Sequence, residues 1–153
     1  MKKLNILLLI IWLIAIFIFS NDVGSSSSEK SDSIATLIVE FISDITGNDY
    51  TDSKLNDMID TCVVIIRKGA HFLEYFILGI LVINVIKDYK ELNVKICIIS
   101  ILLCMLYAIS DEVHQLFVPD RTGKITDVLI DTSGSSLSVF TYYLMYKFKN
   151  RKK

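Results

Sequence analysis

Four ionisable residues lie close together between positions 67 and 74, inside an apolar run. Arg67, His71 and Glu74 are spaced i, i+4 and i+7, which places them within an arc of about 60° on a helix, and Lys68 borders this face. A cation, an imidazole and a carboxylate on one face can hold an anion and exchange protons. Ionisable groups at membrane depth are costly unless they face a cavity or one another, so their placement indicates a site.

Two further polar groups lie farther along the chain. The first directly follows a long apolar run, and one more helical turn there would place Asp111 beside His114 and Gln115. The second shares one stripe of the last apolar run with small residues, which allow a neighbouring helix to approach closely. The first group comprises Asp111, Glu112, His114 and Gln115, and the second comprises Asp127, Asp131, Gly134 and Ser138.

Long apolar runs must position these residues. The chain has 153 residues and 52% hydrophobic content, gathered in four runs rather than in short amphipathic pieces. About 20 apolar residues cross a bilayer, because the hydrocarbon core is about 30 Å thick and a helix rises about 1.5 Å per residue. The sequence therefore predicts an all-α fold, a single membrane domain over residues 1–153 that forms a four-helix transmembrane bundle. Its predicted parts are spans at 4–20, 62–86, 92–110 and 125–147, an outer segment at 21–60, an outer loop at 111–124 and a cytoplasmic tail at 148–153.

The charges that flank the four runs predict the orientation. With the N-terminus inside, the cytoplasmic segments hold ten Lys and Arg against two acids, whereas residues 21–60 outside hold nine acids against two Lys. Because Lys and Arg favour the cytoplasmic side, we predict a multi-pass cell-membrane protein with both termini in the cytoplasm and the polar groups at the extracytoplasmic ends. The first run begins with Lys2 and Lys3, as a signal peptide does, but no small-x-small cleavage signature follows it, which favours an uncleaved anchor.

The outer segment combines a polar and an apolar part. Residues Gly24 to Ser28 are typical of a flexible linker. Beyond them, apolar residues repeat at helical spacing, which predicts a short extracytoplasmic amphipathic helix that lies on the outer membrane surface or caps the bundle. These apolar residues are Ile34, Leu37, Ile38, Phe41, Ile42 and Ile45.

Charge and cysteine content exclude some classes of partner. The formal net charge is −1 and no basic aromatic patch is present, so we expect no nucleic-acid partner. Cys62, Cys97 and Cys104 lie in or beside apolar runs without metal-binding spacing. We therefore expect them to pack as free thiols.

The three polar groups share one depth and one side of the predicted bundle, so a single pocket open to the outside would accommodate them all. The alternative is a set of buried ion pairs that only holds the helices together, and it is less favoured because such pairs roughly break even with apolar packing. The candidate catalytic residues are His71, Glu74, Asp111, Glu112 and Asp131, and the candidate substrate-binding residues are Arg67, Lys68, His114, Gln115, Arg121 and Asp127.

Three ordered motifs carry a resemblance to a known family. They read Arg67-Lys68-x-x-His71-Phe72-x-Glu74-Tyr75-x-x-Leu78-Gly79, Asp111-Glu112-x-His114-Gln115-x-Phe117-x-Pro119-x-Arg121 and Asp127-x-x-x-Asp131-x-x-Gly134. Over about residues 62–148 the chain resembles the VanZ-like family, named for a membrane protein associated with resistance to the lipoglycopeptide antibiotic teicoplanin. Asp120 stands where this family commonly has Gly, and Ser133 where it commonly has an apolar residue. The resemblance implies a role in the cell envelope, and the richness in Ile, Lys and Asn is consistent with an AT-rich Gram-positive source.

Two classes of function remain open for the pocket. An enzyme acting on a lipid-linked envelope precursor would use His71 or Glu112 as its base, oriented by Glu74 or Asp131. Its cations Arg67, Lys68 and Arg121 would then hold a phosphate or carboxylate. A non-catalytic accessory protein would instead sequester or exclude a lipid-tailed ligand such as the lipoglycopeptide. A small transporter is less favoured, because the four spans show no inverted repeat.

A divalent metal is a further cofactor to weigh, although the sequence does not favour it. Carboxylate and imidazole ligands suit Mg, Mn or Zn, but an Asp-x-x-His spacing is not diagnostic by itself. The residues considered for such a site are His71, Glu74, Asp111 and His114.

Overall fold

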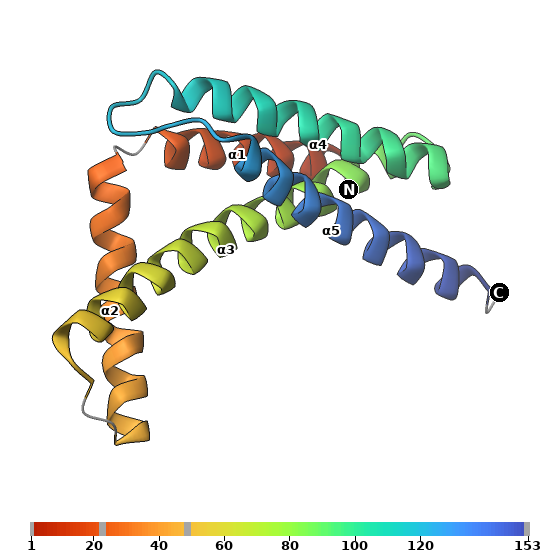
Figure 1. Ribbon diagram of the computed structural model, residues 1–153. Helices are drawn as coiled ribbons and strands as arrows, with labels where there is room; N and C mark the ends of the chain where they lie inside the picture. Colours follow the sequence, from red (N-terminus) through yellow and green to blue (C-terminus); the bar gives the residue numbers. More distant parts are fainter. Residues whose placement is uncertain (1, 22–23, 48–49, 152–153) are drawn as a thin grey trace.

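The computed structural model describes residues 2–21, 24–47 and 50–151, and it contains five helices and no strand within these ranges. The prediction of an all-α fold is therefore confirmed. The helices are α1 (Lys2–Ser20), α2 (Gly24–Thr46), α3 (Asp52–Lys87), α4 (Val94–Gln115) and α5 (Ile125–Arg151), and they are joined by short connections (Figure 1).

Three helices in the described ranges, α1, α3 and α4, are long and apolar enough to cross a membrane. Their large aliphatic side chains include many that face outward, such as Ile11, Ile65 and Leu106. A protein with so much exposed apolar surface on long helices is a membrane protein. Helix α5 is not among the three, because Asp127, Asp131 and several Ser and Thr residues reduce its apolar character.

Helix α3 is much longer than the span predicted at 62–86. It begins at Asp52 and has 36 residues, and a helix of that length extends over about 54 Å, well beyond the thickness of a hydrocarbon core. Helix α4 likewise continues to Gln115, so the first five residues of the predicted loop 111–124 are helical. Its N-terminus is capped by Asn93, whose side chain accepts a hydrogen bond of 3.0 Å from the amide of Ile96.

Helix α2 is longer than the predicted short helix, and it buries small side chains against α3. The expectation of a flexible linker at Gly24 to Ser28 was wrong, because these residues form the first turns of α2. The small side chains of Ser31, Ala35 and Val39 lie on the buried face of α2, which packs on α3, whereas the broad apolar face stays exposed and leaves Leu37 67% accessible. Figure 1 shows α2 turning away from α1 to lie beside the first half of α3.

The core forms where α1, α3 and α4 meet. Ile16, Tyr75, Leu78 and Ala108 are buried there, together with Cys104. The indole of Trp12 donates a hydrogen bond of 3.0 Å to the backbone carbonyl oxygen of Glu74 and so ties α1 to α3. The expectation for the cysteines is confirmed, since all three are free thiols and Cys97 and Cys104 are buried.

Helices α3 and α5 form the most extensive contact in the molecule, and small residues make it possible. A Cβ atom added to Gly134 would collide with the backbone carbonyl oxygen of Phe72. One added to Gly79 would collide with the hydroxyl of Ser138 and would lie 2.8 Å from the carbonyl oxygen of Ser135. The two backbones therefore approach as closely as glycine allows, which is a common way for membrane helices to associate.

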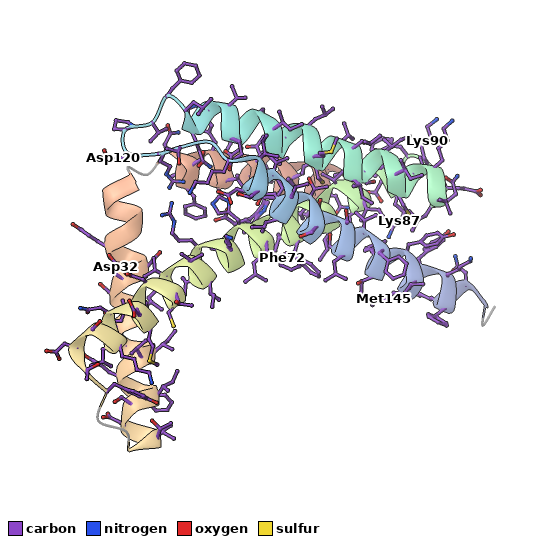
Figure 2. The ribbon with its side chains drawn as sticks, in the orientation of Figure 1. Asp32, Phe72, Lys87, Lys90, Asp120 and Met145 are labelled. Atoms are coloured by element: carbon purple, nitrogen blue, oxygen red, sulfur yellow. The ribbon has the colours of Figure 1, made fainter. Side chains whose placement is uncertain are left out.

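The bundle has two chemically different ends. At one end Asn5 donates a hydrogen bond of 2.7 Å to Asp88, and the ammonium of Lys2 lies 4.8 Å from the ring centroid of Tyr89. At the other end the connection after α4 reaches back to the end of α1, where Arg121 donates a hydrogen bond of 3.2 Å to the carbonyl oxygen of Phe19. Figure 2 shows Lys87 and Lys90 at the first end and Asp120 at the second.

Candidate functional site

The site begins with the face of α3 that the sequence singled out. Arg67, His71 and Glu74 line one cavity of about 260 Å³ at the end of the bundle opposite Lys90. The side chains of Asp111 and Gln115 from α4 and of Arg121 from the following loop line the same cavity. The structure thus brings together six residues that the sequence predicted to share a site.

A second cavity of about 280 Å³ adjoins the first. The two share Arg67, His71, Gln115 and Arg121, and the second adds Lys68 and Asp127 from the predicted set. Both cavities therefore combine guanidinium groups with carboxylates. A cavity that presents two Arg side chains suits an anionic ligand, because each guanidinium can hold a phosphate or carboxylate through two hydrogen bonds.

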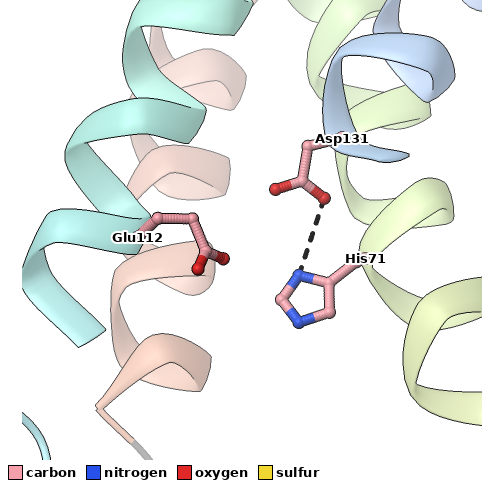
Figure 3. A group of neighbouring side chains, drawn as sticks. All are labelled: His71, Glu112 and Asp131. Carbon is pink, nitrogen blue, oxygen red and sulfur yellow. Dashed lines mark ion pairs between the residues drawn. The ribbon is translucent and has the colours of Figure 1, made fainter. Parts of the chain in front are cut away.

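His71, Glu112 and Asp131, one residue from each of α3, α4 and α5, form a cluster that we call the inner cluster (Figure 3). Of the three, His71 alone also lines the two cavities. The Nδ1 atom of His71 lies 3.6 Å from Oδ1 of Asp131, and Asp131 is fully buried. One candidate ligand atom from each of the three residues lies within 4.8 Å of the others. Two carboxylates from neighbouring helices therefore converge on one imidazole.

The close contact between α3 and α5 positions Asp131. Gly134 lies one turn after Asp131, against the backbone of Phe72, which follows His71 directly. A larger residue at position 134 would hold the helices apart and would move Asp131 away from His71. The spacing Asp131-x-x-Gly134 therefore serves geometry as well as chemistry.

Glu112 is held in place by the loop that follows α4. The amide of Lys124 donates a hydrogen bond of 2.7 Å to Oε2 of Glu112. This contact depends on Gly123, where an added Cβ would lie 2.5 Å from the carbonyl oxygen of Glu112. The second carboxylate oxygen, Oε1, is buried and has no hydrogen-bond partner in the described residues. Figure 3 shows the carboxylate of Glu112 on the side that faces His71.

An apolar groove of about 360 Å³ lies on the other side of Glu112, between α4 and α5. Its walls are mainly aliphatic, with Ile109, Val113, Leu116 and Val128 among them. Lys124 lines both this groove and the second polar cavity, so the apolar and the polar spaces meet at that residue.

One residue of the predicted set, His114, has different surroundings from those expected. Asp111 does lie beside Gln115, whose amide donates a hydrogen bond of 3.2 Å to it. His114 instead faces α1, where its Nε2 lies 3.0 Å from Oδ1 of Asn21 and its ring packs on Phe17. The residues first considered for a metal therefore do not gather around His114, and the cluster at His71 has other members.

Sequence reasoning did not select three residues that shape the site. Tyr75 is fully buried one turn after His71, and its hydroxyl has no hydrogen-bond partner in the described part of the chain. Tyr75 stands in the first motif, which could have drawn attention to it. Lys124 holds Glu112 through its backbone amide, so its residue type carries no signal of that role, whereas Gly123 could have been noticed as a glycine, since a Cβ there would collide with the carbonyl oxygen of Glu112.

These features define a helical membrane protein with a buried histidine–carboxylate cluster beside two polar cavities. The chain belongs to the VanZ/LLP1 family, which it matches over residues 5–146. The resemblance to the VanZ-like family expected from the three motifs is thereby confirmed, and it extends to α1 and α2. No curated protein and no solved structure matches the chain.

Proposed function

We propose that this VanZ-like protein binds or acts on the anionic head group of a lipid-linked cell-envelope component at the outer leaflet, and that it thereby lowers susceptibility to lipoglycopeptide antibiotics such as teicoplanin. The observation that carries this proposal is the pair of cavities that share Arg67 and Arg121 at one end of an apolar bundle. A phosphate in these cavities would meet two guanidinium groups.

The proposal places the cavities outside the cell. Helices α1, α3 and α4 cross the membrane, and α5 crosses as a fourth span with its polar and small residues against α3. The N-terminus, the connection between α3 and α4, and the end of α5 then lie in the cytoplasm, where their Lys and Arg are favoured. The cavities lie at the opposite end of the same helices, beside Asn21 and Arg121.

Helix α2 fits this arrangement as a helix on the outer membrane surface. Its exposed face carries Leu37, Phe41 and Ile45, each at least 65% accessible, while Ser31 and Ala35 on its opposite face are buried. A helix with a broad apolar face of this kind can rest in the head-group region.

The apolar groove beside Glu112 supports a ligand with a lipid tail. An acyl or polyprenyl chain in the groove would lie among Ile109, Val113 and Leu116, and Lys124 stands where the groove meets the polar cavity. One molecule can therefore place its tail in the groove and its charged head beside Arg121.

Orientation can be tested by labelling intact cells with a membrane-impermeant maleimide, in a variant whose three cysteines are replaced by Ala. Asp32→Cys on α2 should label from outside, and Lys90→Cys should label only after the cells are opened. Labelling of Lys90→Cys in intact cells would overturn the proposed orientation.

Function can be tested by removing the two shared cations. Arg67→Gln together with Arg121→Gln should return teicoplanin tolerance of a susceptible Gram-positive host to the level without the protein. Lys147→Gln together with Lys149→Gln is the matched control, because it removes the same charge at the other end of the bundle. Equal tolerance in the two double variants, at equal amounts of protein in the membrane, would refute the proposal.

Binding and catalysis can be separated with the inner cluster. Chemistry on the head group needs a base, so Glu112→Gln should abolish tolerance while the purified variant still binds a polyprenyl phosphate in nanodiscs. Tolerance that survives Glu112→Gln and His71→Ala would exclude catalysis by these residues and leave binding alone.

A further inference from the structure

The inner cluster has more unsatisfied polar atoms than its burial should allow. Both carboxylate oxygens of Asp131, the Oε1 atom of Glu112 and the Nδ1 atom of His71 are buried and have no hydrogen-bond partner in the described part of the chain. Asp131 is 0% exposed and Glu112 is 5% exposed. Buried polar atoms are nearly always paired, so four such atoms around one point indicate a ligand that bonds to all of them.

The distances within the cluster fit a metal ion better than a hydrogen bond. The 3.6 Å between Nδ1 of His71 and Oδ1 of Asp131 is too long for a hydrogen bond. Metal–ligand distances of about 2.0–2.2 Å place two neighbouring ligands of a tetrahedral ion roughly 3.4 Å apart. The ligand atom of Glu112 lies within 4.8 Å of the other two, so the three atoms surround one centre.

The charge of this cluster is a second, independent reason to expect a metal ion. Two carboxylates and one imidazole converge at a place where Asp131 has no contact with solvent. Burying like charges together is strongly unfavourable, so the two carboxylates must take up protons or gain a positive charge beside them. A divalent ion supplies that charge at the position where the orphaned atoms meet.

The surroundings also resemble the outer support of metal sites. The amide of Lys124 holds the Oε2 atom of Glu112, while the buried Oε1 atom has no hydrogen-bond partner in the described part of the chain. Hydrogen bonds of this kind fix the orientation of ligating carboxylates. Asp131 is fixed by the contact of Gly134 with α3.

We propose that His71, Glu112 and Asp131 bind one divalent cation of the Mn²⁺ or Zn²⁺ class. One nitrogen and two carboxylate oxygens suit these ions, whereas Ca²⁺ takes six to eight oxygen ligands. Three protein ligands leave coordination positions open. His71 also lines both polar cavities, so the ion lies beside the space where an anionic group would bind. This ion binding goes beyond the proposed function and does not depend on it, because the metal can be measured without the lipid ligand.

The test is equilibrium dialysis of the purified full chain in detergent against Mn²⁺ or Zn²⁺, with bound metal counted by mass spectrometry. The wild-type chain should bind one ion per chain, and Asp131→Asn and Glu112→Gln should each weaken binding at least about 10-fold. His114→Ala is the matched control, because it removes the other histidine of the chain, which lies outside the cluster. The control should bind one ion as the wild type does.

Two outcomes would overturn the proposal. One is wild-type binding no stronger than that of Asp131→Asn and Glu112→Gln. The other is loss of the ion in His114→Ala, which would place it elsewhere. Thermal unfolding followed by circular dichroism, with the ion and with a chelator, gives a second measurement, since only a chain that binds the ion should unfold at a higher temperature with it. Metal binding without antibiotic tolerance would refute only the proposed function, and tolerance without metal binding would refute only the ion site.

Discussion

The contact between α3 and α5 predicts that one added methyl group at Gly134 destabilises the protein. In Gly134→Ala the new Cβ would collide with the carbonyl oxygen of Phe72, and that obstacle is backbone within a helix. It cannot rotate aside as a flexible side chain would. The helices must therefore separate, which costs about 3 kcal/mol at the upper end of the usual range for overpacking.

A second glycine in the same pair of helices provides the control. Gly69 lies in α3 with no atom within 4 Å of an added Cβ. Because Ala is favoured over Gly in a helix by about 1 kcal/mol, Gly69→Ala should stabilise the chain by about that amount. The helix preference of Ala over Gly also offsets part of the overpacking cost at Gly134, so Gly134→Ala should lower the free energy of unfolding by about 2 kcal/mol. The two variants should therefore differ in that free energy by about 3 kcal/mol.

The assay is unfolding of the full chain in mild detergent by increasing amounts of sodium dodecyl sulfate, followed by circular dichroism at 222 nm. Gly134→Ala should unfold at a lower fraction of dodecyl sulfate than wild type, and Gly69→Ala at an equal or higher fraction. Equal midpoints for the two variants would refute the close approach of α3 and α5, and with it the reason for the position of Asp131.

Three further changes test local features in the same assay. Asp120 has a φ of 58°, a left-handed conformation that glycine adopts without strain. Asp120→Gly should therefore stabilise the chain by up to about 1 kcal/mol. A loss of stability would instead mean that the Asp120 carboxylate makes a stabilising contact. Asn93→Ala removes the cap that accepts from Ile96 and should cost about 1 kcal/mol, and no change would show that α4 begins without help from this cap. Trp12→Phe removes the hydrogen bond to the carbonyl oxygen of Glu74 and should cost about 1 kcal/mol; a larger loss would point to packing of the indole rather than to its N–H.

Helical periodicity was enough to predict much of the candidate site. The spacing of Arg67, His71 and Glu74 fixed their common direction once that stretch was read as a helix, and all three line one cavity. The pairing of Asp131 with Gly134 predicted a close helix contact, which the structure has with α3. Both predictions depend only on the geometry of one helix.

The sequence did not predict which distant segments contact each other. The side chain of His114 contacts Asn21, which lies 93 positions away at the end of α1, and so points away from the other residues of its motif. Glu112 is held by a backbone amide, which any residue type at position 124 other than proline would offer. In α2 the periodicity identified the helix, but burial of the small face with Ala35 and exposure of the apolar face follow from where α3 lies.

The low apolar character of α5 has a consequence for how the protein is made. A segment carrying Asp127 and Asp131 partitions poorly into lipid by itself, since an Asp near the centre of a translocating helix costs about 3 kcal/mol. The polar side of α5 avoids contact with lipid only when it packs on another helix such as α3, and in the structure Asp131 and Ser135 are fully buried. Because α5 follows α3 along the chain, this surface has already left the ribosome when α5 emerges. In the proposed orientation, the order of the helices along the chain lets α5 enter the bilayer together with a partner, and a chain shortened before α5 would leave the face of α3 around Gly79 open to lipid.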